Sequence, residues 1–237
     1  MSLLQSQPAA AGRPPRAVRE GLWLFAPNRD AQGGSAWWLA CGAGRGGMLI
    51  DCPAFTEANL AFLQQQGEGR KGEGRILLTG REGHGRVRRF QEALGWPVLV
   101  QEQEAYLLPG VQRLEPFGAE RDLGDGLQLR WTPGPTPGAA VLLAHGAGVA
   151  DSVLFCGRLL SPSAPGQAAP LRTRRSFHWG RWLRSLEQLR AWLPPEAPQW
   201  LASGAGLGLL RGEALIPNAR AMLDGLNLAA LVDQQPI

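Results

Sequence analysis

From Val18 onward, short apolar runs alternate with turns rich in glycine. Such runs, bounded by turn residues and lacking helical spacing, are typical of buried β-strands. The pattern therefore predicts a succession of strands. They are expected at residues 21–26, 36–41, 48–51, 76–79, 98–100, 126–131, 140–144, 153–156 and 199–202.

Segments with helical spacing of apolar residues lie between these strands. Thr56 is a suitable N-cap for a helix that runs to about Gln66. A glycine-rich loop after residue 79 leads into a helix over 87–94, which Gly95 ends. Further helices are expected at 102–107, 182–193 and 217–226. No repeat of fixed period is visible, which argues against solenoids and propellers.

Two segments show neither pattern. Residues 1–17 are mainly Ala, Gln, Pro, Gly and Arg, and we expect a disordered tail because so little apolar surface cannot offset the entropy of ordering. Residues 161–177 are expected to be a long loop that is functional or mobile. The rest, 18–237, is predicted to be a single domain, since single α/β domains reach about 200–250 residues.

Composition narrows the class of protein only modestly. Apolar residues make up 44% of the chain and charged residues 19%, which is ordinary globular usage. The net charge of +4 is too small to indicate a nucleic-acid partner by itself. The three cysteines show no CxxC spacing, and the chain contains neither a leader-like apolar segment nor 18 consecutive apolar residues. We expect a cytoplasmic protein that has no membrane partner.

Five motifs resemble those of the metallo-β-lactamase superfamily in order and spacing. They read MLIDCP at 48–53, ILLTGREGHG at 76–85, WTPGPTPGAAVLL at 131–143, VLFCGRLL at 153–160 and WLASGAG at 200–206. The resemblance implies an α/β (α+β) fold, a four-layered αβ/βα sandwich of two mixed β-sheets flanked by helices. It also implies a hydrolase whose His and Asp residues bind two metal ions, usually zinc or iron, in a cleft between the sheets.

Carried over residue by residue, the resemblance leaves that metal site without its ligands. The positions of the family's ligands hold Gly80, Glu82, His84, Gly85, Pro135, Arg158 and Ala205. Only Glu82 and His84 carry donor atoms, whereas a catalytic zinc ion needs about three protein ligands. Arg158 stands where the family has an Asp that bridges both metals, and a guanidinium has no lone pair for a metal. The sequence therefore predicts that no metal cofactor is bound.

Four residues remain as candidates for a vestigial, ligand-binding cleft: Asp51, Glu82, His84 and Arg158. Asp51 corresponds to a family residue that organises the metal loop, and we expect it to form a structural hydrogen bond with the loop at 80–85. Arg158 and Glu82 are predicted to form an ion pair in the vacated site, because the two family positions bind the same metal. His84 is expected to be exposed or hydrogen-bonded.

Other candidates for chemistry have simpler structural interpretations. Cys52 and Cys156 stand at strand ends and are expected to be small buried hydrophobic residues. His145 is expected to be exposed in a turn, and His178 to lie in a segment that packs the following helix. Neither Ser161 nor Ser203 has the sequence context of a serine hydrolase.

The densest basic stretch consists of Arg172, Arg174, Arg175, Arg181 and Arg184. A solvated charge run is its simplest interpretation, and a binding site for nucleic acid or an acidic partner is the alternative. Three functions therefore stay open. The first is a catalytically degenerate protein, or pseudoenzyme, that retains the cleft as a structural surface or as a binding surface for an unknown small molecule or protein. The second is a metal-dependent hydrolase with an atypical site on Glu82 and His84. The third is a binder of nucleic acid or an acidic partner through the basic stretch.

Overall fold

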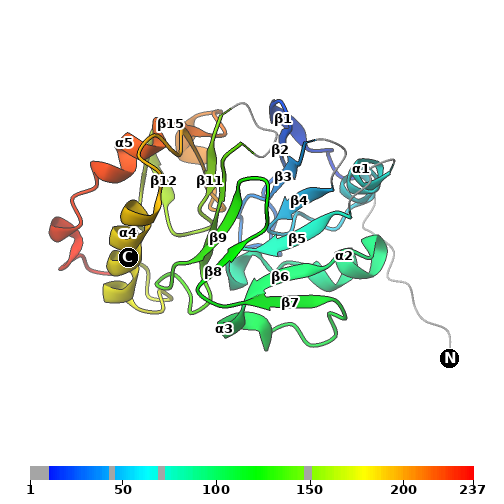
Figure 1. The fold of residues 1–237 in the computed structure, drawn as a ribbon, viewed down its shortest axis with the longest axis horizontal. Coiled ribbons are helices and arrows are strands. Elements are labelled where there is room, and N and C mark those ends of the chain that lie inside the picture. Colours follow the sequence, from blue (N-terminus) through cyan, green and yellow to red (C-terminus); the bar gives the residue numbers. More distant parts are fainter. Residues whose placement is uncertain (1–10, 43–45, 69–72, 147–150) are drawn as a thin grey trace.

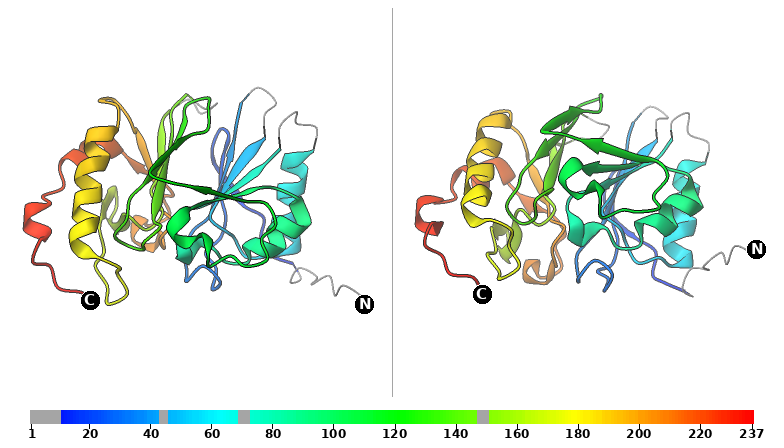
Figure 2. Two further views of the ribbon diagram at one scale, coloured as in Figure 1. Left: turned by 60° about the horizontal axis from the view of Figure 1, so that its bottom comes forward. Right: turned by 90° about the horizontal axis from the view of Figure 1, so that it is seen from below.

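A computed structural model describes residues 11–42, 46–68, 73–146 and 151–237 of the chain. Two β-sheets lie face to face, with helices on both outer sides, so that the molecule has four layers (Figures 1 and 2). The predicted four-layered sandwich is therefore confirmed. Within the described residues, no helix is both long and apolar enough to span a lipid bilayer.

The first sheet has seven strands in sequence order. Its strands β1 to β4 are antiparallel, and β4 to β7 are parallel. The strands are β1 (Arg16–Arg19), β2 (Leu22–Leu24), β3 (Trp37–Ala40), β4 (Gly47–Ile50), β5 (Arg75–Leu78), β6 (Val98–Gln101) and β7 (Leu114–Phe117). Helices α1 (Glu57–Gly67), α2 (Val87–Leu94) and α3 (Glu102–Ala105) follow β4, β5 and β6.

The second sheet has six strands in the order β15-β14-β11-β10-β9-β8. Only β11 and β14 are parallel neighbours in it. The strands are β8 (Glu120–Asp122), β9 (Leu127–Trp131), β10 (Ala140–Ala144), β11 (Val153–Phe155), β14 (Trp200–Ala202) and β15 (Ile216–Pro217). Helix α4 (Trp179–Trp192) covers its outer face, and α5 (Ala219–Asp224) follows β15 (Figure 2).

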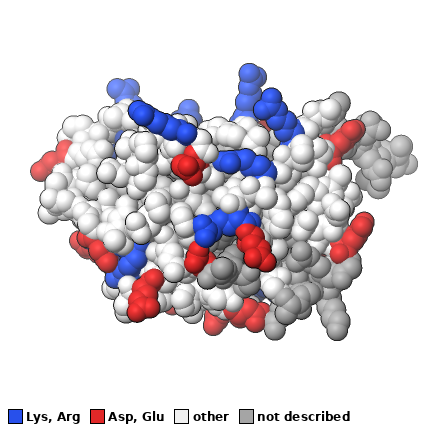
Figure 3. Space-filling model, turned by 90° about the horizontal axis from the view of Figure 1, so that it is seen from above, with Lys and Arg blue, Asp and Glu red and all other residues white. Residues whose placement is uncertain are grey.

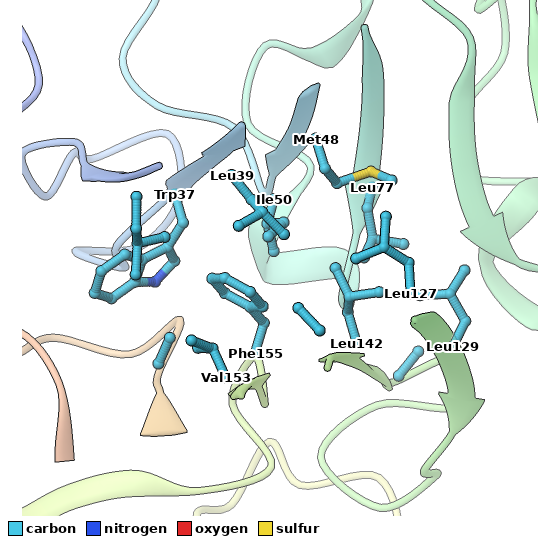
Figure 4. Packing of buried hydrophobic residues seen from close by; sticks show 14 of the residues in the cluster. Trp37, Leu39, Met48, Ile50, Leu77, Leu127, Leu129, Leu142, Val153 and Phe155 are labelled. Atoms are coloured by element: carbon cyan, nitrogen blue, oxygen red, sulfur yellow. The ribbon is translucent and has the colours of Figure 1, made fainter. Parts of the chain in front are cut away.

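Alternation along the strands sorts the apolar side chains into three buried clusters, one for each contact between layers. In β3 and β4, Trp37, Leu39, Met48 and Ile50 point toward the other sheet, where they meet side chains such as Phe155 (Figure 4). The alternate residues of both sheets pack under helices instead. Those of the first sheet include Trp38, Leu49, Ile76 and Leu78 beside Phe90 of α2, and those of the second include Val141, Leu143 and Leu154 beside Leu186 of α4.

The helix boundaries follow the predicted signals. Thr56 is the N-cap of α1, and its side chain accepts a hydrogen bond from the amide of Asn59 at 3.3 Å. Gly95 ends α2 in the left-handed conformation, with φ of 72°. Helix α4 stops two residues before Pro194.

Several predicted boundaries need correction. Strand β1 begins at Arg16, inside the segment predicted to be a disordered tail, while residues 1–10 lie outside the described part of the chain. The predicted loop at 161–177 contains a hairpin, β12 (Ser161–Ala164) paired with β13 (Gln167–Ala169). The last predicted helix is shorter than expected, because Ile216 and Pro217 form strand β15.

Candidate functional site

Loops from both sheets meet at one edge of the sandwich, and each of the five motifs contributes one of them. The loop after β5 is joined to the start of β10, since Ala140 donates a backbone hydrogen bond to Thr79 at 2.9 Å. The loop after β14 is joined to the loop after β11, since Gly204 donates to Gly157 at 2.7 Å. The candidate cleft residues therefore stand on a connected backbone frame.

Asp51 is a buried carboxyl at the centre of this frame. Its Oδ1 accepts a hydrogen bond from the amide of Thr79 at 2.8 Å, and its Oδ2 accepts one from the Thr79 hydroxyl at 2.7 Å. Burial raises the pKa of Asp51 to about 6, and the two hydrogen bonds from Thr79 oppose this rise only in part. The predicted bond to the loop at 80–85 is wrong by one residue, because the donor is Thr79, just before that loop.

The loop after Thr79 approaches Asp51 so closely that it needs glycine. A Cβ atom at Gly83 would lie 2.1 Å from Oδ1 of Asp51, which no side chain tolerates. A Cβ atom at Gly157, whose φ is 52°, would lie 2.4 Å from the hydroxyl of Thr79. These glycines keep the frame tight around the Asp51–Thr79 pair.

Arg158 enters the same edge from the end of β11 and binds backbone carbonyls. Its Nη2 donates hydrogen bonds to the carbonyl oxygens of Ala31 at 2.8 Å and Gln32 at 3.1 Å. The predicted ion pair between Arg158 and Glu82 is wrong: no charged atoms of these two described residues approach within 4.0 Å, because the loop at 28–34 holds the guanidinium instead. Burial raises the pKa of Glu82, and the positive charge of Arg158 offsets part of that rise.

A cavity of about 320 Å³ opens beside Glu82 and Arg158. Arg174 and Arg175 line it as well, so the structure brings part of the basic stretch to the predicted cleft. Glu82 and Arg158 also line a recess of about 10 Å³ next to Asp51. That recess has room for roughly one water molecule.

The other arginines of the basic stretch point elsewhere. The guanidinium of Arg172 lies 5.6 Å from the centre of the Trp179 ring and donates to the carbonyl of Gln234. That of Arg181 lies 5.9 Å from the Phe177 ring, and Arg184 is exposed on α4. The predicted patch therefore does not form one continuous surface.

His84 is separated from Glu82 in its contacts, although the two are close in sequence. Its Nε2 lies 3.8 Å from Oε2 of Glu104, and it lines a depression with Arg86 and Leu107. Burial lowers the pKa of His84 to about 4, against the opposing effect of the Glu104 charge. His84 is therefore neutral near pH 7.

Sequence reasoning missed Glu104, a fully buried carboxyl on α3. Its Oε1 accepts hydrogen bonds from the amide of Gly138 at 3.0 Å and from Nε of Arg81 at 3.3 Å. Glu104 thereby ties the loop before β10 to the loop after β5. No signal in the single sequence separates it from the exposed Glu102 on the same helix.

The remaining candidates have structural positions. Burial raises the pKa of Cys156 to about 12 and that of Cys52 well above its ordinary value, so neither supplies a thiolate. His145 is exposed, as predicted. His178 is also exposed, and it caps α4, because its Nδ1 accepts a hydrogen bond from the amide of Arg181 at 3.2 Å. Phe177 is 45% exposed and Trp179 is buried, so Trp179 is the aromatic residue of this segment that packs the helix.

The residues at the metal-ligand positions do not fit a metal centre. Among the described residues, no group of three or more His, Cys, Asp or Glu side chains could hold a metal ion. The guanidinium of Arg158 lines the recess beside Asp51 and Glu82, where it repels a cation.

Comparisons with known proteins agree with this fold. No family model and no curated protein matches the sequence. Among solved structures, an archaeal metallo-β-lactamase superfamily protein from Sulfolobus tokodaii aligns over 92% of this chain and 88% of its own, at a TM-score of 0.59 and 16% identity. The B3 metallo-β-lactamase BLEG-1 aligns over 85% and 96%, at a TM-score of 0.61 and 19% identity. TTHA1623, solved in a di-iron-bound form, aligns over 77% and 94%, at a TM-score of 0.53 and 25% identity.

The chain thus has the metallo-β-lactamase fold, as its motifs predicted. It is a divergent representative of that fold, because its sequence identity to these three structures is only 16–25% although the alignments cover most of each chain.

Proposed function

We propose that this chain is a catalytically degenerate protein of the metallo-β-lactamase fold, which keeps the cleft as a binding site. The observation that carries the proposal is the placement of Arg158. Its side chain occupies the edge where the five motif loops meet, and two backbone carbonyls hold it there. Arg158 thus places a fixed positive charge where the family resemblance implies an Asp whose carboxylate bridges two metal ions.

The second candidate is a metal-dependent hydrolase that uses Glu82 and His84. Against it, Glu82 lines the cleft with Arg158, whereas the Nε2 atom of His84 faces Glu104. A metal bound by both side chains would need one of them to leave its present surroundings. The degenerate protein requires no such rearrangement.

The third candidate is a binder of nucleic acid through the basic stretch. Arg172 and Arg181 lie against aromatic rings, and only Arg174 and Arg175 of the stretch line the cavity. The stretch is thus divided between separate surroundings. The opposite face, seen from above in Figure 3, carries interspersed basic and acidic side chains, so it offers no continuous basic track for a phosphate backbone either.

Metal analysis of the purified chain tests the proposal. We expect close to zero equivalents of zinc or iron after dialysis, and no hydrolysis of β-lactam, thioester or phosphodiester substrates when either metal is added back. Close to two equivalents of metal that survive dialysis would contradict the proposal. One equivalent that His84→Ala removes, while Arg158→Gln does not, would favour the atypical hydrolase.

A further inference from the structure

The cavity beside Arg158 is lined by three arginines and one carboxylate side chain, Glu82, so positive side chains outnumber negative ones in its lining. Arg158, Arg174 and Arg175 line the cavity, and none of them takes part in an ion pair with a described residue. Eight of the 18 other described arginines form ion pairs with described carboxylates. The pairs are Arg19–Asp151, Arg81–Glu104, Arg86–Asp30, Arg88–Glu92, Arg113–Glu73, Arg121–Glu115, Arg130–Glu120 and Arg220–Asp224.

Arg158 is oriented in advance for a ligand. Its two bonds to Ala31 and Gln32 both use Nη2, so the donors on Nε and Nη1 are left for another acceptor. Because the side chain is already ordered, binding to it loses little rotamer freedom.

Arg174 and Arg175 stand on a turn with its own hydrogen bonds. The amide of Thr173 donates to the Ser176 hydroxyl at 2.8 Å, and the amide of Ser176 donates back to the carbonyl of Thr173 at 3.0 Å. The amide of Arg175 donates to the Thr173 hydroxyl at 3.2 Å. The turn therefore presents two neighbouring guanidinium groups at the cavity from a defined backbone.

The lining also includes apolar surface. Trp182, Leu171 and Pro135 contribute to it, and Trp182 is fixed by a hydrogen bond from its ring nitrogen to the carbonyl of Leu159 at 2.9 Å. A volume of about 320 Å³ lies at the lower end of the range for small-molecule sites. The cavity thus combines guanidinium groups for an anionic group with a surface for a carbon skeleton.

We infer that this cavity binds a small organic anion, with its phosphate or carboxylate group held by Arg158, Arg174 and Arg175. Phosphate monoesters and carboxylates share the chemistry that guanidinium groups recognise, and the test separates them. Glu82 supplies one acceptor for a hydroxyl group of the same ligand. This inference rests on the proposed function, because a non-hydrolytic cleft needs a ligand that it retains.

The test uses three sugar probes that differ in their acidic group. Binding of glucose 6-phosphate, gluconate and neutral glucose to the full chain is measured by calorimetry at two salt concentrations. We expect one or both anions to bind at least tenfold more tightly than glucose, and more weakly at high salt. The double variant Arg174→Gln/Arg175→Gln should weaken that binding at least tenfold, while Arg184→Gln on α4 leaves it unchanged.

Melting temperatures of both variants confirm that they fold. Equal affinity for the anions and glucose, or anion binding that the double variant leaves intact, would overturn the inference. Tighter binding of a 20-nucleotide single strand that depends on Arg181 and Arg184 would overturn it in favour of a nucleic-acid site. Zinc content is measured on the same preparation. Two equivalents of zinc in a protein that still binds an anion would overturn the proposed function but not this inference. A metal-free protein that binds neither anion would overturn this inference but not the proposed function.

Discussion

The pKa values of Asp51, which is buried, and of His84, which is largely buried, are shifted in opposite directions. Burial raises the pKa of Asp51 from 3.8 to about 6 and lowers the pKa of His84 from 6.5 to about 4. The folded state therefore binds a proton at Asp51 more tightly than the unfolded state does, and a proton at His84 less tightly. Both shifts come from the removal of water at the edge where the motif loops meet.

These shifts predict opposite effects of pH on the free energy of unfolding. The stabilisation that Asp51 contributes is fully present below about pH 4 and is lost as pH rises through about 6. The stabilisation that His84 contributes is fully present above about pH 6.5 and is lost as pH falls through about 4. Each contribution amounts to about 3 kcal/mol, so the two pH dependences largely cancel in the free energy of unfolding of the native chain. Between pH 7.5 and 4.5, Asp51→Asn should lose stability on acidification relative to the native chain, and His84→Gln should gain it.

Urea unfolding across that pH range measures both effects. The groups that face His84 are Glu104 and Arg81, and both stay in place in these variants. Glu187→Gln, at an exposed position on α4, is the matched control. Profiles of all three variants that run parallel to that of the native chain would contradict the prediction.

At the scale of single residues, only part of the site could be predicted from the sequence. The positions of Asp51, Glu82 and Arg158 at one edge followed from motif order, because each motif ends a strand. The partners of these residues did not follow, since Arg158 meets Ala31 and Asp51 meets Thr79 only once the loops have folded together. Glu104 was missed for the same reason: its partners Gly138 and Arg81 are distant in the chain.

At the scale of elements, α4 begins with an unusual cap. His178 accepts a hydrogen bond from the Arg181 amide through Nδ1, which requires a neutral Nδ1 atom. Helix α4 then buries Trp182, Leu186 and Leu189 against the second sheet. An exposed residue thus satisfies the amide at the start of α4, while buried apolar residues pack the helix onto the sheet.

Removal of this cap should destabilise the chain measurably. We expect His178→Ala to lower the free energy of unfolding by about 1 kcal/mol, because the amide of Arg181 loses its side-chain acceptor. His178→Asn, which restores an N-cap acceptor, should recover most of that loss. Denaturant midpoints for the three chains check this, and equal midpoints for the native chain and His178→Ala would show that the cap contributes nothing.

Elements at sheet edges were the hardest to predict. Strand β7 has the sequence LEPF and lies at the edge of the first sheet, where a proline is tolerated because one side of the strand is unpaired. The β12–β13 hairpin is built largely from small residues, so no apolar alternation marks it. Central strands were predicted correctly, because burial on both faces requires apolar runs.

At the scale of the whole molecule, the layered core keeps two thiols from solvent. Cys52 and Cys156 are buried, whereas Cys41 is half-buried. A thiol reagent should therefore modify one cysteine in the native chain and all three in urea, and the two slow reactions should follow global unfolding. Mass spectrometry of the labelled chain identifies the sites. Rapid labelling of Cys156 without urea would show that the C-terminal end of β11 opens on its own.

The anchoring of Arg158 also determines how readily substitution could turn this cleft into a metal-binding one. A single change of Arg158 to Asp would leave the carbonyls of Ala31 and Gln32 without their donor and add a carboxylate close to Glu82 and Asp51. Without a metal to balance that charge, the variant would be less stable than the present chain. A path to a metal-binding cleft that begins at Arg158 therefore passes through a less stable chain, whereas a path that first introduces histidines leaves the contacts of Arg158 with Ala31 and Gln32 in place until the last step.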